Sequence, residues 1–287
     1  MALSIRPITP SFGAEISGVD ITRPLDEATR REVLEAQDRW GVTVWRGTGL
    51  TDETHVAFSR IFGELELAPR APGRKTRFEL PELFDASNLD AEGRIVTDEL
   101  VRLHKKGDRL WHTDTSFMPT RSSHSLLLCH EAPPVAGETW FADTRSAYED
   151  LPQSMKDRLE GLIAEHSIWW SRKVAGYPFT DEDVDARPSA RHPLVHQHPG
   201  SGRMALYVAS HARDITGMPR EEGRALLKEL IEFATQPQYV FNIAYKPGDM
   251  AIWDNFCTMH RGGDFDEVNH RRDMRRTTVR ERVSAPH

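Results

Sequence analysis

The stretch LWHTDTSF, residues Leu110–Phe117, sets a histidine and an aspartate two positions apart, at His112 and Asp114. On an extended strand these two side chains would point to the same face. An imidazole beside a carboxylate can bind a metal, act as an acid–base pair, or form a structural hydrogen bond. A chain with 13 histidines contains about one such H-x-D by chance composition. The motif therefore needs further partners before it indicates any chemistry.

The expected partner is His260, in GDMAIWDNFCTMHRG, where a strand and its exit would deliver a second imidazole. Two histidines and one carboxylate leave three adjacent coordination positions open, which is typical of non-haem Fe(II) oxygenases. A zinc hydrolase needs only one open position. Cys257 and His260 also form a C-x-x-H pair. A structural zinc site is disfavoured, because it needs four such ligands and the sequence offers no second pair.

Arginines form the third chemical feature. HRRDMRR, residues His270–Arg276, follows His260 closely and should form the next strand. On that strand Arg272 and Arg276 would share a face. Guanidinium groups bind carboxylates through two hydrogen bonds, so this face could hold two carboxylates. The remaining arginines of the segment are expected to be solvated or paired with acidic neighbours.

Four segments together, LWHTDTSF, GETWFAD, WDNFCTMHRG and RRDMRR, resemble the Fe(II)/2-oxoglutarate dioxygenases of the taurine and 2,4-dichlorophenoxyacetate dioxygenase family. The resemblance runs from GAEISGVDI through HPGSGRMALYV to the arginine segment, and it is greatest for the aryloxyacetate branch. It implies a mostly β fold with flanking helices around a double-stranded β-helix, or jelly-roll, core. It also implies Fe(II), 2-oxoglutarate and O₂ as cofactor and co-substrates.

The same resemblance implies roles for single residues. His112, Asp114 and His260 would be the iron ligands, Thr139 would bind 2-oxoglutarate through its hydroxyl, and Arg272 would hold the far carboxylate of 2-oxoglutarate. No further catalytic residue is expected.

The resemblance assigns the primary substrate to Arg276, which would contact its anionic group or lie next to the co-substrate carboxylate. The implied reaction hydroxylates an aryloxyacetate, such as 2,4-dichlorophenoxyacetate, beside its ether oxygen. The product then falls apart to a phenol and glyoxylate, with succinate and CO₂ formed from 2-oxoglutarate. Taurine, another alkylsulfonate, or an alkyl sulfate is the alternative substrate within the family. A metal hydrolase and a non-enzymatic sensor are more remote alternatives.

The chain departs from the family pattern at two places. Several relatives carry an asparagine four residues before the first histidine, where this chain has Asp108. We expect Asp108 to turn away from an anionic substrate or to select a different group. The aryloxyacetate branch also brings in a basic residue from a loop after the second helix, and no residue here matches it cleanly. The candidates in LAPRAPGRKTR are Arg70, Arg74, Lys75 and Arg77.

The elements that would position these residues follow from periodicity and turn signals. Helices are expected at Pro24–Trp40, at Thr51–Gly63, around Gln153–Glu165 and at Glu221–Thr235. Polar or charged loops are expected at Pro69–Arg77, Ala91–Asp108 and Thr180–Arg191. Many short strands favour a sandwich or barrel. The strands are expected at Gly41–Gly47, Ser125–Ala132, Glu138–Asp143, Ala205–Ser210, Tyr239–Tyr245, Asp249–Asn255 and Arg275–Val283.

Aromatic and histidine side chains surround these segments. Trp111, Trp253 and Phe117 are interpreted as core packing that keeps the metal site dry. The aromatic residues Trp169, Trp170, Tyr177 and Phe179 line a substrate pocket or belong to the ordinary core, and the sequence does not decide between these. A tight cluster of histidines is expected to lie on the surface or in loops: His192, His196 and His198.

Composition sets the remaining limits. The net charge of −7 argues against binding to nucleic acid. No apolar run reaches the length of a membrane span, and no signal peptide is expected. Cys129 and Cys257 are too few for a disulfide scaffold, so both should be buried thiols of a cytoplasmic protein. The 287 residues are expected to form one domain, with an α/β portion over about 1–105 packed on the jelly roll. We expect a homo-oligomer that acts on a small anionic molecule.

Overall fold

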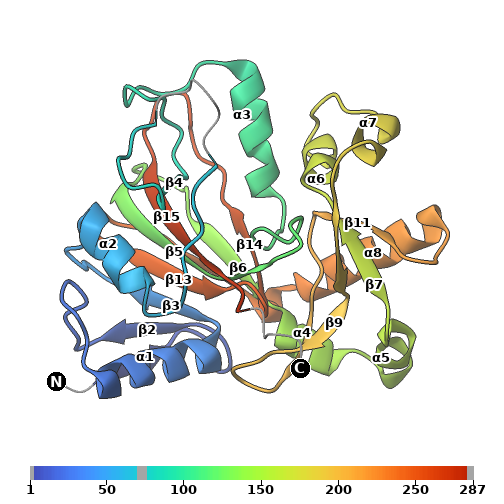
Figure 1. Cartoon of the computed structure of the whole chain (residues 1–287), viewed down its shortest axis with the longest axis horizontal. Helices are drawn as coiled ribbons and strands as arrows, with labels where there is room; N and C mark the ends of the chain where they lie inside the picture. The colour runs from blue at the N-terminus through green and yellow to red at the C-terminus, as the bar shows by residue number, and fades with distance from the viewer. Residues whose placement is uncertain (1–2, 70–75, 283–287) are drawn as a thin grey trace.

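The computed structural model of the chain describes residues 3–69 and 76–282. Its largest feature is a seven-stranded sheet with the order β1-β2-β3-β13-β5-β15-β4 (Figure 1). Its pairings are antiparallel except for the parallel pair β2–β3. The strands are β1 (Ser4–Pro7), β2 (Ala14–Ser17), β3 (Val42–Trp45), β4 (Phe84–Asp85), β5 (Ser122–Glu131), β13 (Met250–Asp254) and β15 (Asp273–Arg280).

A second sheet faces the first. It has the order β12-β6-β14, with β12 (Val240–Ile243), β6 (Thr139–Asp143) and β14 (Thr258–Gly262), all antiparallel. Buried side chains from both sheets form one apolar cluster that includes Val44, Leu127, Phe141, Trp253 and Met274. Two antiparallel sheets packed over a shared core are the two halves of a jelly roll. The predicted fold class, mostly β with flanking helices around this core, is confirmed.

Two helices cover the outer face of the large sheet. They are α1 (Glu27–Trp40) and α2 (Asp52–Ser59), and their apolar side chains pack with those of the sheet in a second cluster. The Asp26 carboxylate accepts a hydrogen bond from the first turn of α1, and a capping box at Thr51 begins α2. Both helices were predicted. However, α2 ends at Ser59, before the predicted stop at Gly63.

A third layer packs on the small sheet. Its apolar cluster includes Leu159, Leu206, Leu226 and Leu230. The predicted helix α8 lies here. The elements are α4 (Thr144–Asp150), α5 (Gln153–Leu159), α8 (Arg220–Ala234), η2 (Pro237–Tyr239), a sheet of β11 (Ala212–Ile215), β7 (Ile163–His166) and β8 (Ala190–Pro193), and the hairpin of β9 (Val195–Gln197) and β10 (Met204–Leu206).

Three sequence predictions for helices and loops were wrong. The helix expected around Gln153–Glu165 ends at Leu159, because Gly161 adopts a positive φ of 71° and the chain then continues as strand β7. The loop expected over Ala91–Asp108 contains helix α3 (Glu99–Lys105), which Asp98 caps, followed by the 3₁₀ turn η1 (Lys106–Arg109). The loop expected over Thr180–Arg191 begins with α7 (Asp181–Asp185), which has its own capping box.

The other strand predictions were correct in position, although the strand expected at Ala205–Ser210 is only the short β10. The loop predicted at Pro69–Arg77 lies mostly outside the described residues. Helices α3 and α6 (Ile168–Val174) both lie at the top of the molecule in the view of Figure 1. Among the residues that the structure describes, none of the helices combines the length and apolarity of a membrane span.

Candidate active site

His112 and His260 are brought together by the backbone. The amide of each residue donates to the carbonyl of the other, at 2.9 Å and 2.7 Å, so the two residues form an isolated antiparallel bridge. Directly paired residues on neighbouring strands present their side chains on the same face. The two imidazole rings accordingly lie 4.1 Å apart between centroids. His260 belongs to β14, one turn beyond the strand exit where it was expected.

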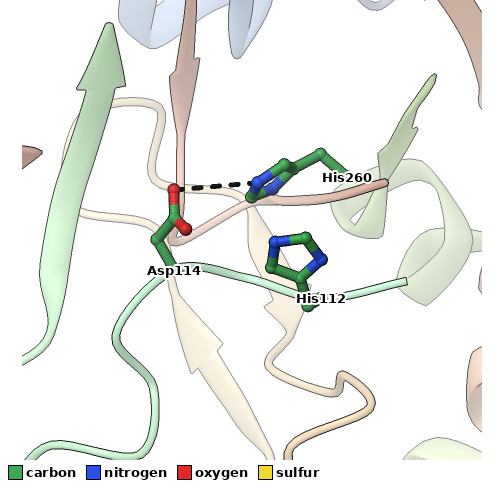
Figure 2. A group of neighbouring side chains, drawn as sticks. All are labelled: His112, Asp114 and His260. Atoms are coloured by element: carbon green, nitrogen blue, oxygen red, sulfur yellow. Dashed lines mark ion pairs between the residues drawn. The ribbon is translucent and has the colours of Figure 1, made fainter. Parts of the chain in front are cut away.

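Asp114 completes this group from a turn rather than from a strand. Leu110–Phe117 contains no strand apart from the bridge at His112, and Thr115 has a left-handed φ of 58°. The turn directs the Asp114 carboxylate at the imidazoles, and its Oδ2 lies 3.7 Å from Nε2 of His260 (Figure 2). One ligand atom from each of the three residues lies within 4.8 Å of the others. The side-by-side placement predicted for His112 and Asp114 is therefore produced by a turn.

All three side chains are buried, with exposed fractions of 7 % for His112, 4 % for Asp114 and 5 % for His260. Burial by itself would raise the pKa of the Asp114 carboxyl. The charge of Arg276, followed by the two histidines, overrides burial and holds this pKa well below its usual value. Burial, followed by the neighbouring His112, lowers the pKa of His260 well below its usual value. The group thus consists of a carboxylate with a neutral imidazole, both in the protonation state that binds metals.

The proton of His112 is placed to leave a lone pair free for a metal. Nδ1 of His112 lies 2.8 Å from the carbonyl oxygen of Leu110. A carbonyl only accepts, so Nδ1 carries the proton and Nε2 keeps its lone pair. Histidine ligands of metals are typically fixed by such a hydrogen bond from the far nitrogen. Two imidazoles and one carboxylate with such lone pairs fit Fe(II).

A second polar group contains Thr139, Tyr245 and Arg272. Nε and Nη1 of Arg272 donate to two carbonyl oxygens, those of Gly137 and Ala86, each at 3.2 Å. Within residues 3–69 and 76–282, no carboxylate pairs with this guanidinium. The buried Tyr245 hydroxyl also has no hydrogen-bond partner among them. A cation and a free hydroxyl beside Thr139, at the start of β6, are suited to a carboxylate ligand.

Tyr245 was missed by the sequence analysis, which treated it only as part of a strand. Burial raises its pKa to about 12, while Thr139 and Arg272 have smaller opposing effects. The hydroxyl therefore keeps its proton near neutral pH and can donate it in a hydrogen bond. Burial also lowers the pKa of Arg272. Arg272 precedes β15, whose register shifts between Asp273 and Met274, so the simple alternation of faces predicted for this segment does not apply.

Arg276 lies beside the candidate metal-binding group formed by His112, Asp114 and His260. Its Nη1 donates to Oδ1 of Asp114 at 2.5 Å, and its guanidinium stacks on the Phe84 ring at 4.7 Å. The neighbouring arginines behave as predicted for the rest of this segment. Arg271 pairs with Glu131 and Arg275 pairs with Asp52.

The departure at Asp108 has a structural explanation. Its carboxylate turns to α6 and accepts a hydrogen bond from Nη2 of Arg172 at 3.0 Å. The Arg172 guanidinium packs directly on Gly107, where a Cβ would lie 1.7 Å from Nη1. A Cβ at this position would displace the guanidinium, so glycine permits this close approach. Asp108 therefore brings no unpaired negative charge to the site, as one of the two expectations for it stated.

Comparison with known proteins identifies the family. The family described as "Taurine catabolism dioxygenase TauD, TfdA family" matches residues 4–278. The chain belongs to this family. Over 282 residues it is 37 % identical to an alpha-ketoglutarate-dependent 2,4-dichlorophenoxyacetate dioxygenase of Burkholderia sp., covering 97 % of this chain and 95 % of the relative. The enzyme of the same name from Cupriavidus pinatubonensis is also 37 % identical, with coverage of 97 % and 98 %.

A solved structure agrees with this family membership. The crystal structure of AAD-2 in complex with Mn(II) and N-oxalylglycine has a TM-score of 0.90, 38 % sequence identity, and 98 % coverage of both chains. The chain is thus a 2-oxoglutarate-dependent dioxygenase, an oxidoreductase that uses Fe(II), 2-oxoglutarate and O₂.

In this dioxygenase, apolar rings pack beside the histidine pair. Trp253 is 1 % exposed, and its ring lies 4.5 Å from that of His260. Phe141 stacks on the same imidazole at 6.3 Å. Trp253 is core packing, as predicted, and so limits the access of water to the metal-binding group.

The sequence analysis missed His211, which lies beside the metal-binding group. Its ring is 5.9 Å from that of His112 and 5.1 Å from that of Phe117, and its Nδ1 lies 3.1 Å from the Ser116 hydroxyl. Burial, followed by the neighbouring His112, lowers the pKa of His211 well below its usual value. Nothing local in the sequence indicates that His211 lies near His112, because the two residues are distant in the chain and meet only in the folded structure.

The histidine cluster was predicted to lie on the surface or in loops; only His198 lies in a loop, and the cluster is mostly buried. His192 and His198 are buried and His196 is half-buried. The surface prediction was wrong because His192 of β8 faces the carbonyl of Met118, while β9 and the turn after it pack against the end of β13. There Nε2 of His198 donates to Oδ2 of Asp254 at 2.8 Å. The ligand atoms of His198, Asp254 and Cys257 also lie within 4.8 Å of one another.

Of the four basic residues considered for the aryloxyacetate branch, Arg70, Arg74 and Lys75 lie outside the described residues. Arg77 is described, and it pairs with Asp85 at 3.0 Å and with Asp273 at 2.5 Å. The aromatic residues with undecided roles lie around α6, where Tyr177 and Phe179 stack at 4.6 Å and Trp169 packs on Phe179 at 5.7 Å.

Proposed function

We propose that His112, Asp114 and His260 hold the Fe(II) of this dioxygenase. The observation that carries the proposal is the convergence of three buried ligand atoms within 4.8 Å, with Nε2 of His112 free of a proton because Nδ1 donates to Leu110. Three protein ligands on one face of the metal leave positions for a chelating co-substrate and for O₂. When bound, the iron supplies the reduced centre at which O₂ is activated.

We propose further that Arg272, Thr139 and Tyr245 bind the far carboxylate of 2-oxoglutarate. Among the described residues, Arg272 has no carboxylate partner and the buried Tyr245 hydroxyl makes no hydrogen bond within 3.5 Å, although the Thr139 side chain lies near it; both observations support this role. Binding would satisfy both groups at once, because a carboxylate accepts several hydrogen bonds and neutralises the guanidinium. Thr139 and Arg272 were predicted for this role from the sequence, and Tyr245 is added by the structure.

For the primary substrate we propose an aryloxyacetate such as 2,4-dichlorophenoxyacetate, which would give this chain a role in aromatic catabolism. The support is the 37 % identity, over nearly the whole chain, to two enzymes named for that substrate. One oxygen atom of O₂ enters succinate as 2-oxoglutarate loses CO₂. The other enters the carbon beside the ether oxygen. The resulting hemiacetal releases the phenol and leaves glyoxylate.

The anionic group of the substrate is proposed to contact Arg276. Nη1 of this residue is engaged by Asp114, so the contact would use the remaining part of the guanidinium. Arg172, which pairs with Asp108, also lies close enough to His211 to lower the pKa of that residue, so it offers positive charge nearby. Holding the anion would direct the neighbouring carbon toward the metal, and such positioning carries much of the rate.

The test is a substrate panel with purified protein, Fe(II), 2-oxoglutarate and O₂, scored by succinate and phenol release. Aryloxyacetates, aryloxypropionates, taurine and alkyl sulfates belong on it. We expect strict dependence on all three cofactors and the highest turnover with an aryloxyacetate. Higher turnover with taurine or an alkyl sulfate would overturn the substrate and leave the iron chemistry intact. Turnover without 2-oxoglutarate would favour a hydrolase instead.

Three broader expectations also remain proposals: one domain over residues 1–287, homo-oligomeric assembly, and a cytoplasmic location. The pairing of β3 with β13, which joins the N-terminal strands to the jelly-roll sheet, supports the single domain. Light scattering coupled to size-exclusion chromatography would test the oligomer, and a single thermal unfolding transition would test the domain.

A further inference from the structure

Asn255 follows the last residue of β13 and is almost completely buried, at 1 % exposure. Its Oδ1 accepts hydrogen bonds from Nε1 of Trp253 and from the backbone amide of Asp114, both at 3.1 Å. Its Nδ2 donates to Oγ of Ser125 at 3.1 Å. Ser125 in turn donates to Oδ2 of Asp114 at 2.7 Å. Asn255 is therefore connected to Asp114 by two routes. It binds the backbone amide of Asp114 directly, and it is linked to the Asp114 carboxylate through Ser125.

The turn before Asp114 is held by the same residue. The hydroxyl of Thr113 donates to the backbone carbonyl of Asn255 at 2.8 Å and also lies 3.3 Å from its Oδ1. Directly after Asp114, Thr115 adopts a positive φ of 58°, which is unfavourable for a β-branched residue. A strained turn keeps its shape only when its surroundings impose it. The contacts of Asn255 are well placed to do so.

Both oxygens of the Asp114 carboxylate are engaged. Oδ1 accepts from Arg276 at 2.5 Å and Oδ2 accepts from Ser125 at 2.7 Å. Oδ2 is the oxygen that lies 3.7 Å from Nε2 of His260. With one oxygen drawn to Arg276 and the other fixed beside the histidine, the carboxylate cannot rotate to present both to one ion. A carboxylate that bound through both oxygens would occupy one of the positions needed for 2-oxoglutarate and O₂.

We propose that Asn255 is a positioning residue of the metal site. It orients Asp114, directly and through Ser125, so that the carboxylate binds the metal through a single oxygen and three coordination positions stay open. The inference rests on the proposed function, in which Asp114 is a metal ligand. It predicts that Asn255 controls the affinity for metal and the affinity for 2-oxoglutarate without touching either.

The experiment compares wild type, Asn255→Ala, Ser125→Ala and the double variant by Mn(II) titration, using electron paramagnetic resonance to count free Mn(II). We expect Asn255→Ala to weaken Mn(II) binding roughly 10- to 100-fold, the usual effect of removing a partner of a metal ligand. Ser125→Ala should have a smaller effect. The double variant should be little worse than Asn255→Ala, because both substitutions interrupt the same path to Asp114. Asn242→Ala, on the exposed side of β12, is the control and should match wild type.

A second measurement distinguishes positioning from general loosening. At saturating Mn(II), calorimetric titration of 2-oxoglutarate should give about tenfold weaker binding in Asn255→Ala, because the released carboxylate competes for the position that the co-substrate needs. Circular dichroism and thermal unfolding identify any variant that does not fold. Ser125→Ala removes a single oxygen atom and keeps the test available if Asn255→Ala does not fold.

Wild-type affinity for both Mn(II) and 2-oxoglutarate in folded Asn255→Ala would overturn the inference, and so would fully additive effects in the double variant. Failure of the proposed function looks different. In that case wild type would bind no Mn(II), or His112→Ala would bind it as tightly as wild type. Tight wild-type binding that His112→Ala abolishes and Asn255→Ala leaves unchanged would reject only the positioning role.

Discussion

Two buried groups in this protein have the residue types and spacing of a metal site, and the comparison between them shows what decides the outcome. In one, His112 donates from Nδ1 to the Leu110 carbonyl, which leaves the Nε2 lone pair free. In the other, Nδ1 of His198 accepts from the Ser201 amide at 2.9 Å, so Nε2 carries the proton and donates it to Asp254. The hydrogen bond at the far nitrogen decides which imidazole can bind a metal.

The other two members of the second group are not free to bind a metal either, because the Asp254 carboxylate accepts hydrogen bonds and the Cys257 thiol keeps its proton. Oδ1 of Asp254 accepts from the Phe256 amide at 2.8 Å. Burial raises the pKa of the Cys257 thiol well above its usual value, so the thiolate that a metal would need does not form near neutral pH. The group of His198, Asp254 and Cys257 is therefore a hydrogen-bonded support. It anchors the end of β13, and the next residue, Asn255, reaches Asp114 in the first group.

The largest expected difference is in metal binding. His112→Ala, Asp114→Ala and His260→Ala should each lower Mn(II) affinity by at least about 100-fold and abolish succinate formation, because each removes one of three ligands. His198→Ala should leave Mn(II) affinity within about twofold of wild type, since its Nε2 has no free lone pair. Mn(II) titration with circular dichroism as the folding control measures both. Normal succinate formation in one of the first three variants would remove that residue from the site, and loss of stoichiometric Mn(II) in folded His198→Ala would make the second group a metal site.

The two groups also differ in their surrounding charge, because Arg272, near the first group, pairs with no carboxylate in the part of the chain that the structure describes. Arg272→Ala should raise the 2-oxoglutarate concentration needed for half-maximal turnover by about 10- to 100-fold, the value of a charge-assisted pair with a carboxylate. Arg271→Ala is the matched control, because Arg271 is next to Arg272 in the chain but its guanidinium is exposed and already paired with Glu131. A 2-oxoglutarate titration of the two variants measures the effect. Identical titrations would place the far carboxylate elsewhere.

A substitution at Arg276 tests whether this residue, beside the first group, positions the substrate. Arg276→Ala should still consume 2-oxoglutarate slowly but release about tenfold less phenol per succinate, because the substrate anion is no longer positioned. Arg280→Ala, at the exposed end of the same strand, is the control. Parallel assays of phenol and succinate give the ratio. If the ratio stays at the wild-type value, another cation holds the anion.

The smallest expected effect is on the free energy of unfolding, and it depends on the second group alone. Burial by itself would raise the pKa of Asp254, but His124 and the hydrogen bond from His198 lower it from 3.8 to about 2. A carboxyl whose pKa is lower in the folded state contributes stability above its unfolded pKa and loses that stability as pH falls through the folded pKa. We therefore expect Asp254→Asn to be less stable than wild type at pH 6, with about 2 kcal/mol of the difference lost between about pH 4 and pH 2.

Urea unfolding of wild type and Asp254→Asn across this pH range measures the difference, since other acidic groups affect both proteins alike. Two parallel stability curves would show that His124 and His198 do not stabilise the Asp254 carboxylate in the folded state. Mn(II) affinity at neutral pH, measured on the same samples, would show how far the second group influences the first through Asn255.

Local signals in the sequence were sufficient for much of the scaffold. The Thr51 capping box, the apolar face of α8, the β-branched run of β3 and the leucine run of β5 specify their elements, because caps and short apolar runs act over a few residues. Two elements were not predicted although local signals for them are present. Helix α3 was missed although Asp98 caps it, because its surroundings are rich in charged residues. Strand β7 was missed although Gly161 marks the end of the preceding helix.

The sequence by itself determined the chemical types at the site: two histidines, one carboxylate, and arginines in a following segment. The tertiary structure decided which of these atoms are free to act. The bridge between His112 and His260, the pairing of Asp108 with Arg172, and the place of Tyr245 near Arg272 all join residues from different elements. Hydrogen-bond partners and protonation depend on which backbone groups surround a side chain, and only the packing of distant strands determines those neighbours.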